Sequence, residues 1–458
     1  MSNAATVPQS VLFPDLFERP LVASFDQPDT SSDGGAVLLK AADRRLGLLD
    51  ALAAAWPDER AAHKVQHTVH DLLAQRVFGI ACGHPDGNDA DALADDPIYK
   101  LLLDRDPLTG RRLASQPSLS RFEHRARPRP LYRLAEALAD VVIARHRRRH
   151  RRARLVTVDL DVTADPTHGA QQLSFFNGFY DTWCYLPLVA TLTFDAEPRQ
   201  YVVATILRPG NAATAIGVRH LVRQLLPKLW AAFPKAQLRV RLDGGFATPA
   251  LFNELDAAGV EYLIGMARNS RLAKAATPLL RPLRRAARQT GETATSFGET
   301  TYQARTWPHA RRVIIKAEVT CHPGRERRDN PRFVVTNLRQ SPAWIYQHVY
   351  CARGDSENRL KELHRALALG RTSCTRFWAN QLRVLLSAAA FVLLQELQLH
   401  ADRTTLAGAQ VERLRQAVLT LGTRVTRSVR RLVLHFPATH PHVRVWHQLA
   451  QRLGAVAR

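Results

Sequence analysis

Three acidic side chains stand where their carboxylates could act together on a phosphodiester bond. Asp161 lies near the end of the alternating stretch "RLVTVDLDVT", Asp243 ends the similar stretch "QLRVRLDGG", and Glu357 lies in "YCARGDSENRLKELHRA". Mg²⁺ binds oxygen ligands and takes one or two carboxylates per ion. Two such ions, about 3.5–4 Å apart, can activate an attacking oxygen and stabilise a leaving one. Three converging acids therefore predict a metal-dependent nuclease-type site.

Each acid also has a structural interpretation that the residues alone leave open. An aspartate at a strand end often forms a turn, and this applies to both Asp161 and Asp243. Glu357 has Arg353 four residues before it and Lys361 four residues after it, a spacing typical of ion pairs along a helix. The metal interpretation requires all three acids in one pocket, where their mutual repulsion would raise their pKa values if no cation were bound.

The spacing of apolar residues predicts the elements that carry these acids. Apolar and polar residues alternate over 156–163, which predicts a strand with its apolar face in the core. Further strands are predicted in "CYLPLVATLTF", "QYVVATIL", "QLRVRL" and "EYLIGMA". Helices are predicted at about 212–233 and after Thr248, an N-cap residue followed by Pro249 at the first helical position.

The remaining segments surround this mixed core. Helical periodicity dominates from about residue 36 to 150, after an irregular start, and strands return in "TTYQARTW", "RRVIIKAEVTC" and "RFVVTNL". A helix with Glu357 and a long apolar helix follow, and the last fifty residues have a basic, helical pattern. We therefore predict an α/β fold whose mixed sheet is flanked by helices and interrupted by a β-rich insertion. The predicted segments are a helical region 1–150, a core 151–289, the insertion 290–349, a core completion 350–400 and a helical tail 401–458.

The charge composition indicates a polyanionic partner. The 458 residues include 64 Lys and Arg against 41 Asp and Glu, which gives a net charge of +23 and a pI near 10.7. Five scattered cysteines without a CxxC pair disfavour a disulfide framework or a zinc site and fit a reducing compartment. The start "MSNAATVPQS" has no secretory pattern, and "VLLSAAAFVLL" is too short to span a membrane. We expect a soluble cytoplasmic protein with no membrane partner.

Two further stretches, which do not contain the three acids, each have two possible interpretations. "LASQPSLSRFEHRA" precedes another helix and could form a DNA-reading helix pair or simply pack. The run "RHRRRHRRAR" (residues 145–154) could be a solvated helix end or a stripe that contacts phosphates.

The residues around Glu357 resemble the DDE transposases of bacterial insertion sequences, in the subgroup with a Tyr-(2)-Arg-(3)-Glu-(6)-Lys signature. Tyr350, Arg353 and Glu357 match that spacing, but His364 stands in place of the final lysine. Lys361 lies one turn earlier and could substitute for it. The phosphate-contacting role of the last signature position is therefore open.

Two further motifs carry the same resemblance over roughly residues 110 to 400. "DLDVTADPTHGAQQ" is similar to the first family motif, in which Thr or Ser stands two residues after the catalytic aspartate; this selects Asp161, followed by Thr163, over Asp159. "RLDGGFA" is similar to the second motif and selects Asp243. A contribution from Asp159 or Asp165 stays open. "RFVVTNL" is similar to the strand before the signature.

The resemblance implies an RNase H-like core and cut-and-paste DNA transposition. Asp161, Asp243 and Glu357 would be the catalytic residues and hold two Mg²⁺ ions, for which Mn²⁺ could substitute. Tyr350, Arg353, Lys361 and His364 would contact the DNA. The partners would be terminal inverted repeats and target DNA at the bacterial nucleoid, with a dimer joining the two ends.

Members of this subgroup commonly form a hairpin at the transposon end and hold a flipped base with the insertion. Trp307, near a predicted hairpin tip in "ARTWPHARR", is the candidate stacking residue, with ordinary sheet packing as the alternative. His168 in "DPTHGAQQ" could act as a base, but a metal-bound water needs no histidine base, so a loop-bracing role is favoured. Arg359 points elsewhere on the helix.

Two other functions are compatible with the sequence. One is a DNA-binding protein that has lost catalysis, against which the retention of all three acids argues. The other is an RNase H-fold nuclease that cleaves without strand joining. His364→Lys is expected to keep or raise activity if the last signature position contacts phosphate.

Overall fold

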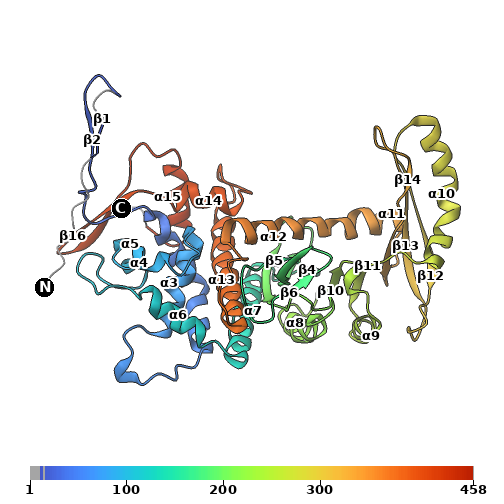
Figure 1. Ribbon diagram of the computed structural model, residues 1–458, viewed down its shortest axis with the longest axis horizontal. Coiled ribbons are helices and arrows are strands. Elements are labelled where there is room, and N and C mark those ends of the chain that lie inside the picture. The colour runs from blue at the N-terminus through green and yellow to red at the C-terminus, as the bar shows by residue number, and fades with distance from the viewer. Residues whose placement is uncertain (1–10, 14–15, 457–458) are drawn as a thin grey trace.

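The computed structural model describes residues 11–13 and 16–456, and the first ten residues, predicted to be irregular, lie outside this range. A helical N-terminal part and the C-terminal tail lie together at one end, and a long sheet extends from them (Figure 1). The sequence predicts an irregular segment before residue 36, but short strands occur there: β1 (Val11–Phe13), β2 (Leu21–Ala23) and β3 (Thr30–Ser31). Up to residue 150 the chain is then mainly helical, as predicted.

The N-terminal helices pack around a long apolar helix from the C-terminal half of the chain. They are α1 (Val37–Leu46), α2 (Leu48–Ala55), α3 (Val69–Cys82), α4 (Asp89–Leu93), α5 (Pro97–Leu102), α6 (Gln116–His124) and α7 (Pro128–Arg149), with 3₁₀ turns η1 (Gly34–Ala36) and η2 (Ala62–Lys64). Helix α13 (Phe377–His400) contacts α1, α3 and α6 as well as α7 and strand β9 (Tyr201–Ile206) (Figure 1). It therefore joins the helical part to the sheet.

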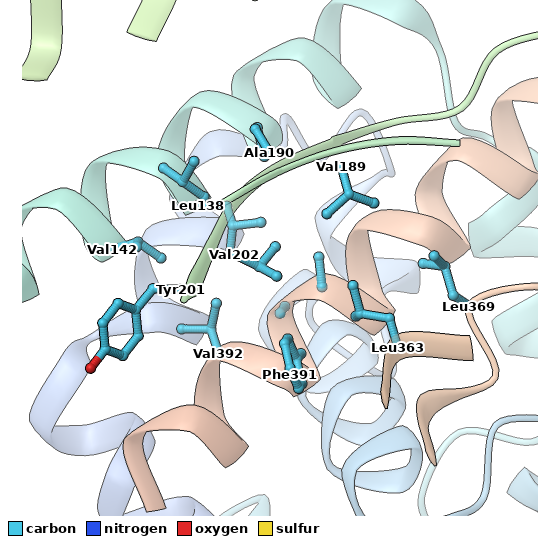
Figure 2. Packing of buried hydrophobic residues seen from close by; sticks show 14 of the residues in the cluster. Leu138, Val142, Val189, Ala190, Tyr201, Val202, Leu363, Leu369, Phe391 and Val392 are labelled. Atoms are coloured by element: carbon cyan, nitrogen blue, oxygen red, sulfur yellow. The ribbon is translucent and has the colours of Figure 1, made fainter. Parts of the chain in front are cut away.

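Helix α13 is the one helix among the described residues that is long and apolar enough to cross a membrane, and 89% of its most apolar window is buried in the protein. The apolar stretch "VLLSAAAFVLL" (residues 384–394) lies inside it and is buried throughout. Figure 2 shows Phe391 and Val392 of this helix among side chains from α7, β8 (Leu188–Phe194), β9 and helix α12 (Gly354–Leu367). Packing in the core therefore explains its composition.

The sheet has the order β9-β8-β4-β10-β11, continued by β15-β13-β12. Next to β8 and β9, the sheet contains β4 (Leu155–Val162), β10 (Gln237–Leu242) and β11 (Glu261–Met266). β8 is antiparallel to β4 and β9 is antiparallel to β8, whereas β10 and β11 run parallel to β4. Helices α8 (Val218–Ala232) and α9 (Pro249–Ala257) make the two parallel crossovers. All five strands were predicted from the apolar pattern.

The predicted insertion continues the central sheet. Its strands are β12 (Ala294–Tyr302), β13 (Arg311–Thr320) and β15 (Arg332–Thr336), and β14 (Arg328–Asp329) pairs with β13. β15 is antiparallel to β11, so hydrogen bonds join the insertion directly to the core. Helix α10 (Ser270–Thr290) packs on β12 and β13 (Figure 1); its internal Pro278 and Pro282 weaken the helical sequence pattern.

A second, small sheet lies between β4 and β8 in the chain. It has the order β5-β7-β6 and consists of β5 (Asp165–Pro166), β6 (Phe175–Asn177) and β7 (Thr182–Tyr185). The sequence predicts only one long strand from residue 184 onward. Pro187 interrupts that stretch, because proline cannot donate a ladder hydrogen bond, and β8 begins directly after it.

The prediction of a helical C-terminal tail is wrong in its middle part. Helices α14 (Val411–Val418) and α15 (Val443–Arg452) flank a hairpin of β16 (Thr423–Ser428) and β17 (Arg431–His435). The hairpin adds to β3, pairing Thr423 with Ser31. β-Branched residues at Thr423, Val425 and Val433 suit a strand, and the partner lies too far away in sequence for a local pattern to indicate it.

Candidate active site

Asp161 and Asp243 lie at neighbouring strand ends. β4 and β10 are parallel, and their register pairs Asp159 with Arg241. Two residues further along, Asp161 is the second-last residue of β4, and Asp243 comes directly after β10. The carboxyl ends of parallel strands are the usual place for a binding site in such a sheet. The register of the two strands therefore brings these two acids close to each other.

The turn after β10 fixes the backbone at Asp243. The Asp243 carboxylate accepts a hydrogen bond from the Gly245 N–H (2.8 Å) and caps the short 3₁₀ helix η3 (Gly244–Phe246). A Cβ atom at Gly245 would lie 2.8 Å from the Thr214 side chain, so a larger residue would be crowded. Asp243 itself is half-buried. The Gly-Gly pair turns the chain away and leaves the carboxylate at the rim of the sheet.

Asp159, the alternative to Asp161, has a structural role. Its carboxylate is buried and bound by the Arg241 guanidinium, with Nε–Oδ1 and Nη2–Oδ2 distances of 2.5 and 2.7 Å. Arg241 Nη1 also donates to the Val349 carbonyl (2.6 Å), just before the signature. This buried pair joins β4, β10 and the start of the signature segment. Sequence reasoning missed Arg241, although its position opposite Asp159 follows from a parallel pairing of the two strands.

Glu357 comes to the site on a continuous helical segment. α11 (Pro342–Trp344), the π-helix η4 (Ile345–Tyr350), the 3₁₀ turn η5 (Cys351–Arg353) and α12 follow one another along it. Leu360, Leu363 and Leu367 form a buried apolar stripe along α12, and Glu357 is exposed. The apolar stripe therefore sets the rotation of this helix.

Charges in the site are coupled through Asp161. Burial raises the pKa of Asp161, and the negative charges of Asp243 and Glu357 raise it further. The Arg353 guanidinium lowers that pKa, because its Nη1 lies 3.0 Å from Asp161 Oδ2. Asp243, Glu357 and Arg353 are thus all within electrostatic reach of Asp161. Arg353 therefore forms an ion pair with Asp161.

Tyr350 lies close to β11 beside Asp243. Burial raises the pKa of Tyr350, and the charge of Asp243 also contributes. Its hydroxyl occupies space that a side chain at Gly265 would need, since a Cβ there would lie 2.5 Å from the Tyr350 oxygen. Gly265 therefore permits the approach of the signature tyrosine to the strand ends, and no sequence motif indicated this glycine.

The remaining signature positions differ from one another in exposure. Lys361 is exposed, which suits a contact with a phosphate. His364 is half-buried, and a hydrogen bond joins its Nε2 to Thr163 Oγ1 (2.9 Å). Burial lowers the pKa of His364. Arg359 is paired with Glu362 at 2.5 Å, away from the acids, as expected.

Trp307 is buried in the core of the extended sheet. Only 6% of it is exposed, and its ring packs 5.0 Å from Phe252 and 5.5 Å from Tyr302 between ring centres. The Arg311 guanidinium lies 5.1 Å from the ring. Although the residue follows β12 as predicted, its indole points inward, so this placement agrees with sheet packing and gives no support to base stacking.

Two residues of the first motif have different surroundings. His168 is exposed in the loop after β5. Asp165 is fully buried, and Thr372 Oγ1 donates to its Oδ2 (2.6 Å) while Oδ1 has no hydrogen-bond partner. Burial raises the pKa of Asp165 to about 7. Thr372, which follows α12, was missed because its partner lies 207 residues away.

Comparison with known proteins assigns the chain to a family. A family model described as "Transposase DDE domain group 1" matches residues 13–457. The chain belongs to this family of DDE transposases. No curated protein matches the chain significantly. Among solved structures, the chain is similar to a piggyBac transposase in a cryo-EM synaptic complex with hairpin DNA, with 9% identity, 93% of this chain and 82% of that chain covered, and a TM-score of 0.41. That score is too low to support an argument about this transposase.

DDE transposases generally use divalent metal ions, and the donors here are of the right kind. Asp161, Asp243 and Glu357 offer carboxylate oxygens, and their mutual repulsion at Asp161 is what a bound cation would relieve. Among the side chains that the structure describes, however, no three from His, Cys, Asp or Glu are gathered tightly enough to hold a metal ion. Arg353 holds Asp161 Oδ2 at 3.0 Å. The donors therefore fit a divalent ion in type and charge, but their side chains would have to move closer together to coordinate one.

Proposed function

We propose that this transposase catalyses cut-and-paste transposition of an insertion sequence, with hydrolysis and strand transfer at terminal inverted repeats. The observation that carries the proposal is the register that brings Asp161 and Asp243 to adjacent strand ends, where the charge of Glu357 also acts on Asp161. The order β9-β8-β4-β10-β11, antiparallel on one side of β4 and parallel on the other, supports the RNase H-like core that the sequence resemblance implies.

Asp161, Asp243 and Glu357 would hold two Mg²⁺ or Mn²⁺ ions. When bound, such ions supply the positive charge that activates the attacking oxygen and stabilises the leaving oxygen. Arg353 carries the nearest guanidinium, and we propose that it transfers from Asp161 to a phosphate oxygen when DNA enters. Lys361, exposed one turn after Glu357, would contact the same strand.

The net charge of +23 favours DNA as the partner, both as inverted repeats and as target. Because both ends of an element must be joined to one target, we propose a dimer in the synaptic complex. We also propose that the protein acts in the bacterial cytoplasm, at the nucleoid.

The test uses duplex DNA from the imperfect inverted repeats that flank the reading frame. Asp161→Asn, Asp243→Asn and Glu357→Gln are expected to lose Mg²⁺- or Mn²⁺-dependent cleavage by more than about 100-fold, since changes even to outer partners of a metal site cost about 10–100-fold. DNA binding in Ca²⁺ should stay near the wild-type level. The control is Asp140→Asn, whose partner Lys228 lies on α8.

Equal cutting by all the variants would overturn the catalytic assignment. Cleavage without joining of the 3′-OH to target DNA would instead favour a nuclease on this fold. Binding without any cleavage by the wild type would favour a DNA-binding protein that has lost catalysis.

A further inference from the structure

The hairpin formed by β6 and β7, which we call the aromatic hairpin (residues 175–185), exposes large apolar rings to solvent. Phe179 at its turn is 87% exposed, an unusual value for a phenylalanine in a folded chain. Three further rings of the hairpin are also exposed, namely Phe176 (50%), Tyr180 (37%) and Trp183 (56%). Neither the catalytic acids nor the signature explains this surface.

Hydrogen bonds hold the aromatic hairpin in a defined shape. Asn177 Oδ1 accepts from the backbone N–H groups of Phe179 (3.0 Å) and Tyr180 (3.3 Å). Asn177 Nδ2 donates to the Gly210 carbonyl (2.8 Å), which ties the turn to the segment after β9. A Cβ atom at Gly210 would lie 2.5 Å from the Phe175 carbonyl, so that close approach requires glycine. The rings therefore project from a fixed turn.

The rings are arranged at angles to one another. Phe179 and Tyr180 meet edge to face with their centres 4.9 Å apart, and Phe176 and Trp183 do so at 6.4 Å. Phe176 and Trp183 are also directly paired across the two strands. Such pairs order the rings while leaving flat faces accessible to a further aromatic group.

The aromatic hairpin lies beside the catalytic acids. β7 pairs with β5, where Asp165 opposes Tyr185, and β5 begins four residues after Asp161. Burial raises the pKa of Tyr180, and the charges of both Asp161 and Asp243 raise it further. The strand pairing therefore places the hairpin next to the segment that follows Asp161, and Tyr180 at its turn is within electrostatic reach of both acids.

This position favours one kind of occupant. A protein partner on the hairpin would cover the acids and exclude DNA from them. A nucleobase that has left the duplex next to the cleaved bond would instead find a ring face within the same site. Every base offers a flat face that stacks on an aromatic side chain. Trp307, the residue first considered for stacking, is buried.

We propose that the aromatic hairpin binds unpaired nucleobases of the DNA strand beside the cleaved phosphodiester bond, with Phe179 and Trp183 as the stacking residues. The inference rests on the proposed function, because it requires DNA at the acids. It assigns to this transposase a base-binding site that is separate from the strands of the insertion.

The experiment measures equilibrium affinity in Ca²⁺ for two inverted-repeat duplexes, one fully paired and one with two unpaired nucleotides at the cleavage position. The wild type is expected to prefer the unpaired duplex. Phe179→Ala and Phe179→Leu should each lose that preference by about tenfold, since leucine keeps the apolar volume but has no ring face. Trp230→Ala, which removes an exposed ring on α8, is the control and should keep it.

A third duplex, with abasic sites at the unpaired positions, separates stacking from other effects. Wild type and Phe179→Ala should bind it equally. If Phe179→Ala and Phe179→Leu kept the wild-type preference for unpaired bases, the hairpin would not be the base-binding site. That result would leave the proposed function intact as long as the paired duplex were bound and cut. Failure of the wild type to bind any inverted-repeat duplex would overturn both proposals.

Discussion

Asp165 shows how a single buried carboxyl can make the fold depend on pH. It is fully buried, its Oδ2 accepts from Thr372, and burial raises its pKa from 3.8 to about 7. Between about pH 4 and pH 7, the folded state keeps a proton that the unfolded state has released. The stabilisation from the neutral carboxyl is therefore fully present below about pH 4 and is lost as the pH rises to about 7.

We predict that Asp165→Asn removes this contribution to the pH dependence. The free energy of unfolding of the wild type, measured with urea, should fall relative to the variant between about pH 4 and pH 7, because only in the wild type does the folded state keep a proton that the unfolded state releases. Asp140→Asn, an exposed change on α7, should follow the wild type. A constant difference between wild type and Asp165→Asn over this range would contradict the prediction.

His364 connects two motifs that are far apart in the sequence. Its bond to Thr163 Oγ1 joins α12, which carries Glu357, to the segment after Asp161. His364→Ala should cost about 1 kcal/mol of stability and lower cleavage more than DNA binding, because the acids lose their mutual alignment. His364→Gln, which can still bond to Thr163, should restore most of the cleavage rate.

His364→Lys separates the two roles of this position. Activity should be kept if the position contacts phosphate, while the cost of burying an ammonium group should lower thermal stability. Thermal unfolding and cleavage assays on the three His364 variants measure both effects. Equal cleavage by His364→Ala and the wild type would exclude a positioning role.

Whole elements are held in register by the buried pair of Asp159 and Arg241. The pair fixes β4 against β10, and through the Val349 carbonyl it also holds the segment before the signature. The relative position of Asp161 and Asp243 therefore depends on an interaction two residues away from each of them. A buried pair is costly to break from one side, because the remaining charge stays desolvated.

We predict that Arg241→Met destabilises the fold by roughly 3–5 kcal/mol, and that combining it with Asp159→Leu recovers much of this loss. The double variant removes both charges, so no buried ion is left without a partner. Denaturant unfolding of the two single variants and the double variant gives the coupling energy. Additive losses in the double variant would mean that the two side chains do not act as a pair.

At the scale of the whole molecule, the C-terminal tail closes onto the N-terminal segment. The Gly34 and Gly35 N–H groups donate to the carbonyls of Leu421 (2.9 Å) and Leu419 (3.1 Å), and β16 extends β3. A Cβ at Gly35 would lie 1.8 Å from the Val418 carbonyl oxygen, far inside contact distance. The segment around Gly35 can approach the segment after α14 this closely only because glycine has no side chain.

Gly35→Ala should therefore lower the stability by about 1–3 kcal/mol or more, since the tail must move away from the N-terminal segment. Gly422→Ala lies in the same region with open space around its Cβ and should have little effect. Thermal unfolding of both variants, together with limited proteolysis of the tail, tests this. Equal melting temperatures for the two variants would argue against the close contact.

Most of the central sheet, and the acids at or next to the ends of its strands, could be predicted from the residues alone. Alternating residues around Val156–Val162 and the apolar stripe of Leu360, Leu363 and Leu367 each depend on local periodicity, which a single sequence displays directly. The family signature selected Asp161 over Asp159, and the buried contact of Asp159 with Arg241 agrees with that choice.

Which distant residues meet could not be predicted in this way. The pairing of β16 with β3, the bond of Thr163 to His364 and the inward orientation of Trp307 join segments that no local pattern relates. The aromatic hairpin likewise became visible only when its strands were folded beside the acids. Periodicity reports which face of an element is apolar, whereas the partner of that face depends on contacts formed across the whole chain.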